Sequence, residues 1–248
     1  MTKKLRETKI VVLIFACLTT SLMNGQAFFV DTFQLTNLSK TTREIKYSTY
    51  DEFVIDRTFA QNNFARHDSP ESLLAALRIA FSYKDELSLY RTPIVEKLKP
   101  RDKGNTHYNL LRRATDQDLT FRLLGKIQID YPGRSIAYLK YSINDFEHGF
   151  RYIAVKSMEK IDSKWYLIND PPLSAIPFVL LNFSDQFIGL ATREGSSNRL
   201  PEIIRGTCID DRTLDFDCLK TLYFESKDRL NQLKLEDKPI LNILRSPI

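Results

Sequence analysis

The residues best suited to proton transfer lie in one short segment, Asn-Asp-Phe-Glu-His-Gly-Phe. Asp145 and His148 stand three positions apart in it, and a carboxylate and an imidazole that enter one pocket can act as a general acid and a general base. The same composition is typical of a polar loop between two strands, with Gly149 at its end. Sequence spacing does not show whether the two side chains converge, so both interpretations stay open.

The other two histidines have simpler explanations. His67 and Asp68 come directly before a predicted helix, where the helix dipole favours a carboxylate. His107 has no partner nearby in the sequence, and we expect it on the surface.

Four aspartates crowd a segment near the C-terminus: Asp210, Asp211, Asp215 and Asp217. Carboxylate oxygens are ligands that Ca²⁺ prefers, but the segment lacks the Gly and the terminal Glu of an EF-hand loop. An acidic solvated loop is therefore favoured, with no metal site.

Several enzyme signatures are missing from the sequence. It contains no His-Glu-x-x-His, no Gly-x-Ser-x-Gly, no Gly-rich phosphate loop and no dinucleotide fingerprint. Metalloprotease, α/β-hydrolase, P-loop and Rossmann functions are disfavoured for this reason, and we expect no cofactor.

The N-terminus has the pattern of a secretory signal. A basic start precedes an apolar stretch of 14 residues, from Ile10 to Met23, with Gly25 and Ala27 placed for cleavage after residue 27. The stretch is shorter than the roughly 20 residues of a membrane-spanning helix. An alternative is that Cys17 carries a lipid that anchors the protein. The sequence predicts a periplasmic or extracellular protein with no transmembrane segment in the mature chain.

Cleavage there would leave 221 of the 248 residues. It would remove four of the 36 basic and one of the 31 acidic residues, which lowers the net charge to +2. So balanced a charge gives no support to a nucleic-acid partner, which needs a concentrated basic face. Of the cysteines only Cys208 and Cys218 would remain, and in an exported chain we expect them to form a disulfide.

One helix start is well marked. Ser69 is a candidate N-cap, and Pro70 follows at the first helical position. Apolar residues then recur at three- and four-residue spacing, which predicts a helix over residues 70–83. A second helix or turn is predicted over 87–98, while residues 28–68 show no clear pattern.

Four strands are predicted over residues 119–129, 135–143, 150–158 and 164–168, joined by short loops such as Tyr-Pro-Gly-Arg. The apolar residues of 119–129 alternate with polar ones, so we expect one face of the antiparallel sheet to be buried and the other solvated. Beyond it, residues 176–190 predict one buried amphipathic helix. A charged helix is expected near 219–234, and any subdomain boundary near 195–198.

This order of elements resembles the NTF2-like superfamily, in particular its small exported members. The resemblance rests on the Ser-Pro-Glu helix start and on a final hairpin in which Lys160, Trp165 and Leu167 match the family pattern. It covers about residues 69–169 and implies an α+β fold, a curved antiparallel sheet packed on an N-terminal helix, with residues 170–248 as a helical extension. It also implies a cavity between helix and sheet.

Two functions follow from the resemblance. The first is an exported non-catalytic module that binds a small apolar or amphipathic ligand, or a partner protein, through the cavity or the sheet surface, with Tyr138, Tyr152 and Trp165 as candidate lining residues. The second is an isomerase or dehydratase that uses His148 and Asp145 for proton transfer. Apart from the resemblance, the separate C-terminal extension is a candidate docking surface for a partner protein. Trp165 on a final strand is also typical of a core position.

Overall fold

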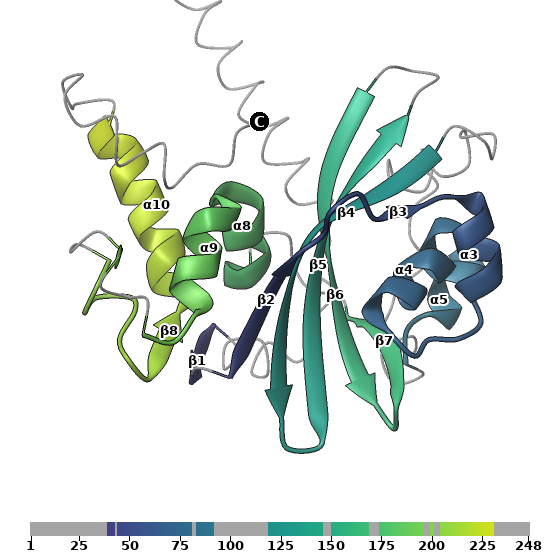
Figure 1. The fold of residues 1–248 in the computed structure, drawn as a ribbon, viewed down its shortest axis with the longest axis horizontal. Helices are drawn as coiled ribbons and strands as arrows, with labels where there is room; N and C mark the ends of the chain where they lie inside the picture. The colour runs from purple at the N-terminus through teal and green to yellow at the C-terminus, as the bar shows by residue number, and fades with distance from the viewer. Residues whose placement is uncertain are drawn as a thin grey trace, which may run out of the picture.

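The computed structural model shows an α+β protein. It describes residues 39–42, 44–80, 83–91, 119–145, 150–168, 174–195, 199–200 and 204–230. An antiparallel sheet stands in the middle of the molecule, with helices on both of its sides (Figure 1). The predicted α+β class is confirmed.

The main sheet has six strands in the order β2-β4-β5-β6-β7, with β3 paired to β4 beside β2. Its strands are β2 Ile45–Thr49, β3 Val54–Ile55, β4 Leu119–Tyr131, β5 Arg134–Asp145, β6 Phe150–Ile161 and β7 Lys164–Ile168. All of its strand pairs are antiparallel. Each of the four strands predicted in this region is present, and each begins within one residue of its predicted start.

A small separate ribbon pairs β1 Lys40–Thr42 with β8 Thr213–Asp215. The predicted disulfide between Cys208 and Cys218 is present beside this ribbon, with a Cα–Cα distance of 5.3 Å. Asp210 and Asp215 have local roles there: Asp210 accepts hydrogen bonds from the backbone N–H groups of Arg212 and Thr213, and Asp215 accepts one from Cys218.

Helices cover the sheet from opposite sides (Figure 1). On one side lie α3 Arg57–Asn63, α4 Pro70–Arg78 and α5 Tyr83–Ser88. On the other lie α8 Ala175–Asn182, α9 Asp185–Thr192 and α10 Phe216–Leu230. In the described part of the chain, none of the helices combines the length and apolar character that crossing a bilayer requires.

The sheet therefore separates two hydrophobic cores. Ala137, Leu139 and Tyr141 of β5 face the α4 side and belong to one core, whereas Ile136 and Tyr138 of the same strand belong to the other, built with α8, α9 and α10. The prediction of a solvated sheet face was wrong for β5, where Tyr138 and Lys140 are buried on the side of the C-terminal helices. In β4, Arg122 is exposed and Lys126 and Gln128 are partly exposed, as the alternating pattern predicts.

A β-bulge at Leu124 changes the alternation within β4. The pairing with β5 shifts register between Leu123 and Gly125, and an extra residue in one strand reverses the side on which the following side chains lie. Phe121 and Leu123 consequently belong to the α4-side core, whereas Ile127 and Ile129 belong to the opposite core. The expected common face for these residues was wrong.

The start of α4 agrees with the prediction. Ser69 caps the helix, its Oγ accepting a hydrogen bond from the Ser72 N–H at 3.0 Å, while the Ser72 Oγ accepts one from the Ser69 N–H at 3.1 Å. This reciprocal arrangement satisfies two backbone donors that the first turn leaves unpaired. The helix ends at Arg78, earlier than the predicted residue 83.

The predicted single helix over residues 176–190 is two helices. The backbone of Phe183 is extended, which ends α8, and Ser184 then caps α9 by accepting a hydrogen bond from the Phe187 N–H. Both short helices present apolar side chains to the same core, so the helical spacing of apolar residues continues across the break. The proposed subdomain boundary includes residues 196–198, which lie outside the described residues.

Candidate functional site

The three aromatic residues expected to line a cavity lie in three different environments. Tyr138 is 1% exposed and packs in the core beneath α8 and α9, whereas Trp165 is 3% exposed and packs in the α4-side core. Tyr152 is 51% exposed. These side chains do not converge on a common site.

The predicted proton-transfer pair falls mainly outside the described residues. His148 lies beyond them, as does His107, and Asp145 is described only through its backbone, which pairs with Leu119 and Phe150 at the end of β5. The pair stays a prediction. His67 has a structural role, since its carbonyl accepts a hydrogen bond of 2.8 Å from the Trp165 N–H; burial and nearby Lys164 lower its pKa.

A groove lies between β2 and α9, with a volume of about 470 Å³. Its walls combine apolar, hydroxyl and charged side chains from one strand and one helix: Ile45, Lys46, Tyr47, Thr49, Asp185, Gly189, Thr192 and Arg193. Volumes of this order are typical of pockets for small ligands.

Asp185 joins the two walls of the groove. Its Oδ1 accepts a hydrogen bond of 2.7 Å from the Tyr47 hydroxyl, and the Lys140 Nζ lies 3.7 Å from the same oxygen. The Lys140 side chain is only 3% exposed. Burial lowers the pKa of Lys140, and Asp185 opposes that shift by stabilising the charged ammonium.

Two features of the groove depend on small residues. A Cβ added at Gly189 would lie 3.9 Å from the Tyr47 ring, an ordinary van der Waals contact, so α9 and β2 approach each other closely here. A Cβ at Gly125 would lie 3.0 Å from the Tyr47 hydroxyl oxygen, closer than ordinary van der Waals contact. Gly125, directly after the bulge, thus leaves Tyr47 the space to reach Asp185.

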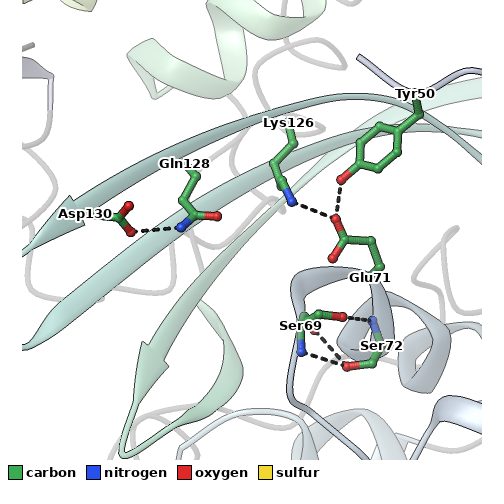
Figure 2. Close-up of polar contacts among 7 residues, drawn as sticks. All are labelled: Tyr50, Ser69, Glu71, Ser72, Lys126, Gln128 and Asp130. Atoms are coloured by element: carbon green, nitrogen blue, oxygen red, sulfur yellow. Dashed lines mark hydrogen bonds and ion pairs between the residues drawn. The ribbon is translucent and has the colours of Figure 1, made fainter. Parts of the chain in front are cut away.

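A second polar cluster lies at the start of α4 (Figure 2). Glu71, in the first turn of the helix, points toward the sheet, where its Oε1 accepts hydrogen bonds from the Tyr50 hydroxyl and, at 2.8 Å, from the Lys126 Nζ. Burial alone would raise the pKa of Glu71, but the hydrogen bonds from Lys126 and Tyr50 outweigh it and the pKa is lowered. This cluster anchors the helix to the sheet.

The polar row continues along β4 beyond Lys126. The Gln128 side-chain amide donates a hydrogen bond to the Asp130 carboxylate at 2.8 Å, as Figure 2 shows, and the Lys46 Nζ of β2 lies 2.7 Å from the same carboxylate. Hydrogen bonds from Lys46 and Gln128 lower the pKa of Asp130 to about 2. Lys46 therefore belongs both to this row and to the groove.

No family model, curated protein or solved structure matches this chain.

Sequence reasoning missed the groove entirely. Tyr47 and Asp185 are 138 positions apart, and neither belongs to a motif. The signals that were available are local: Ser184 and Asp185 have the composition of a helix start, and Gly125 within a strand pattern is typical of a bulge.

Proposed function

We propose that this protein is an exported, non-catalytic binding module, which holds a small amphipathic ligand or a segment of a partner protein in the groove between β2 and α9. The NTF2-like assignment belongs to the same proposal. It is supported by the packing of α4 against an antiparallel sheet that ends in the β6–β7 hairpin with Trp165.

The groove itself carries the proposal. It brings the apolar surface of Ile45 and Tyr47 together with the charges of Lys46, Asp185 and Arg193. Pockets that orient a ligand combine apolar walls with a small number of placed polar groups. A ligand with both apolar and charged parts therefore suits it better than a purely apolar one.

The protonation states of the described groups favour binding over catalysis. Burial and the hydrogen bond to Asp185 raise the pKa of Tyr47 far above neutral pH, so its hydroxyl stays protonated. The pKa of Glu71 is lowered, which makes its carboxylate a weak base. Efficient general acids and bases have pKa values near the working pH, and neither group does.

Export is supported by the disulfide between Cys208 and Cys218, since such bonds persist mainly in oxidising compartments. The isomerase or dehydratase alternative depends on His148, which lies outside the described residues, and on the side chain of Asp145, which is not described, so it stays a prediction.

The test is native mass spectrometry of the protein recovered after export. We expect a bound small molecule or peptide that is lost in Gly189→Leu, because the added side chain fills the groove. The matched control is Gln186→Leu, which adds the same side chain to an exposed position of α9 outside the groove and should keep the adduct. An adduct that survives Gly189→Leu, or catalytic turnover abolished by His148→Gln, would overturn the proposal.

A further inference from the structure

We propose that Lys140 captures a ligand covalently, and that this ligand is a small aldehyde or ketone, which enters the groove between β2 and α9 and forms a reversible Schiff base with the Lys140 amine. The inference rests on the proposed function, because the groove has to admit the ligand. It adds the chemical class of the ligand, a carbonyl compound with an apolar body, and the atom that holds it.

The register of the sheet leads from the groove to Lys140. Thr49 of β2 lines the groove and pairs with Gly125 of β4, which in turn pairs with Lys140 of β5. Residues paired across neighbouring strands lie on the same face of a sheet, so the three form a row. Gly125 has no side chain, and the Tyr47 hydroxyl lies 3.0 Å from where its Cβ would be. The Lys140 side chain can therefore extend over β4 toward the groove, where its Nζ lies 3.7 Å from the Oδ1 of Asp185.

The surroundings of Lys140 make its amine a better nucleophile than that of an ordinary lysine. Its side chain is 3% exposed, and Asp185 is the one group of opposite charge that faces it among the described residues. At 3.7 Å this contact is longer than a hydrogen bond. Burial lowers the pKa of Lys140, so a larger fraction is the neutral amine at neutral pH. Lysines that are removed from water in this way form Schiff bases.

Asp185 is placed to move the protons of this condensation. The ammonium first gives one proton to the Asp185 carboxylate, and the neutral amine attacks the carbonyl carbon. The electron pair of the C=O bond goes to the oxygen, which takes that proton, and a second proton follows from the nitrogen. The oxygen then leaves as water while the C=N bond forms. The product carries one positive charge, as the ammonium did, so its attraction to Asp185 is retained. The Tyr47 hydroxyl, 2.7 Å from Asp185, holds the carboxylate in place.

Lys46 lines the same groove and differs from Lys140 in each of these respects. Its side chain is 76% exposed, and its Nζ lies 2.7 Å from the Asp130 carboxylate. The hydrogen bond to Asp130 and the charge of that carboxylate raise the pKa of Lys46, so its ammonium stays protonated and engaged at neutral pH. Lys46 is therefore an internal control for the reactivity of Lys140.

The first experiment treats the protein recovered after export with a limiting amount of hexanal, and cyanoborohydride reduces any Schiff base to a stable secondary amine. Peptide mapping by mass spectrometry then measures the label on each lysine. At pH 7 we expect Lys140 to carry most of the label and Lys46 little. The difference should become smaller at pH 10, where exposed lysines too are partly neutral. Equal labelling of the two lysines at pH 7, or more label on Lys46, would overturn the proposal.

The second experiment tests whether the aldehyde reaches Lys140 through the groove. Gly189→Leu places a side chain in the groove and should lower the labelling of Lys140 by about tenfold, because the occupied space excludes the probe. Gln186→Leu, at an exposed position of the same helix outside the groove, should leave the labelling unchanged. Circular dichroism confirms that both variants are folded under the labelling conditions. Labelling of Lys140 that is the same in both folded variants would overturn the proposal.

The outcomes separate this inference from the function on which it rests. If native mass spectrometry finds a bound molecule that Gly189→Leu removes, but hexanal and cyanoborohydride leave Lys140 unlabelled, covalent capture is wrong and the groove remains a non-covalent ligand site. If Gly189→Leu changes neither the bound molecule nor the labelling of Lys140, both the inference and the proposed function are wrong.

Discussion

Glu71 shows how one charged side chain can join a helix to a sheet. Its side chain is 15% exposed and that of Lys126 is 20% exposed, so the ion pair is only partly screened by water. The Tyr50 hydroxyl donates to the same carboxylate oxygen, and the Lys126 ammonium lies 5.8 Å from the centre of the Tyr50 ring. The three groups therefore stabilise one another as a unit.

We predict that Glu71→Gln and Tyr50→Phe each lower the free energy of unfolding by about 1.5–3 kcal/mol, the range of hydrogen bonds to charged groups. The double variant should lose less than the sum, because both changes remove the same Tyr50–Glu71 hydrogen bond. Urea unfolding at neutral pH measures all three. Exposed Glu194→Gln is the control and should stay within about 0.5 kcal/mol of wild type. Strict additivity would contradict the shared network.

The lowered pKa of Asp130 predicts that the stability of the protein decreases at acid pH. Its pKa is about 2, below the ordinary 3.8, so its contribution to stability is complete above pH 4 and is lost as the pH falls toward 2. The difference in melting temperature between wild type and Asp130→Asn should be constant from pH 7 to pH 5 and shrink below pH 4. Because the pair with Lys46 is exposed, 1 M salt should reduce the difference. A difference in melting temperature that persists at pH 2 would show that the charge of Asp130 is not the cause of the difference.

At the scale of elements, the features predicted correctly were those with local causes. Ser69 and Pro70 mark a helix start through the hydrogen bonds of the first turn, which depend on neighbouring residues only. The hairpin between β4 and β5 follows from Gly133, whose positive φ of 75° suits a tight turn. Strand pairing across such short loops needs no distant information.

The elements predicted wrongly depend on tertiary contacts or on one extra residue. The bulge at Leu124 transfers Ile127 and Ile129 to the other core, although their apolar alternation is the same with or without it. The end of α8 at Phe183 is hidden because that residue is buried on the same core as Phe187. When helices cover both faces of a sheet, apolar residues occur on both, so the sequence pattern does not show which face a given residue lies on.

The candidate groove shows the same limit. Its walls come from β2 and α9, which meet only after the sheet and the C-terminal helices have packed. Cys208 and Cys218 could be paired from composition alone, but the contact of Tyr47 with Asp185 could not.

For the whole molecule, the decisive feature is that two cores share one sheet. In β5, Leu139 packs on the α4 side and Tyr138 on the α9 side. If either layer of helices separated from the sheet, it would expose the apolar side chains on the face that it covers, while the other face of the same strands stayed packed. The chain should unfold in one cooperative transition, which argues against a boundary that lets residues beyond 195–198 unfold alone.

The single tryptophan makes this testable, since Trp165 lies in the α4-side core and reports on that side alone. Phe187 is fully buried in the opposite core, and Phe187→Ala should cost about 3–5 kcal/mol. If the two layers are one unit, this substitution shifts the urea midpoint of Trp165 fluorescence as far as that of far-UV circular dichroism.

Leu77→Ala, in the core of Trp165 itself, should also move both signals together. Phe224→Ala, at a ring that is 46% exposed, is the control for loss of an aromatic residue and should shift both much less. A fluorescence midpoint unmoved by Phe187→Ala would mean that the C-terminal helices form a separate unit, because a cavity in one cooperative structure destabilises every part of it.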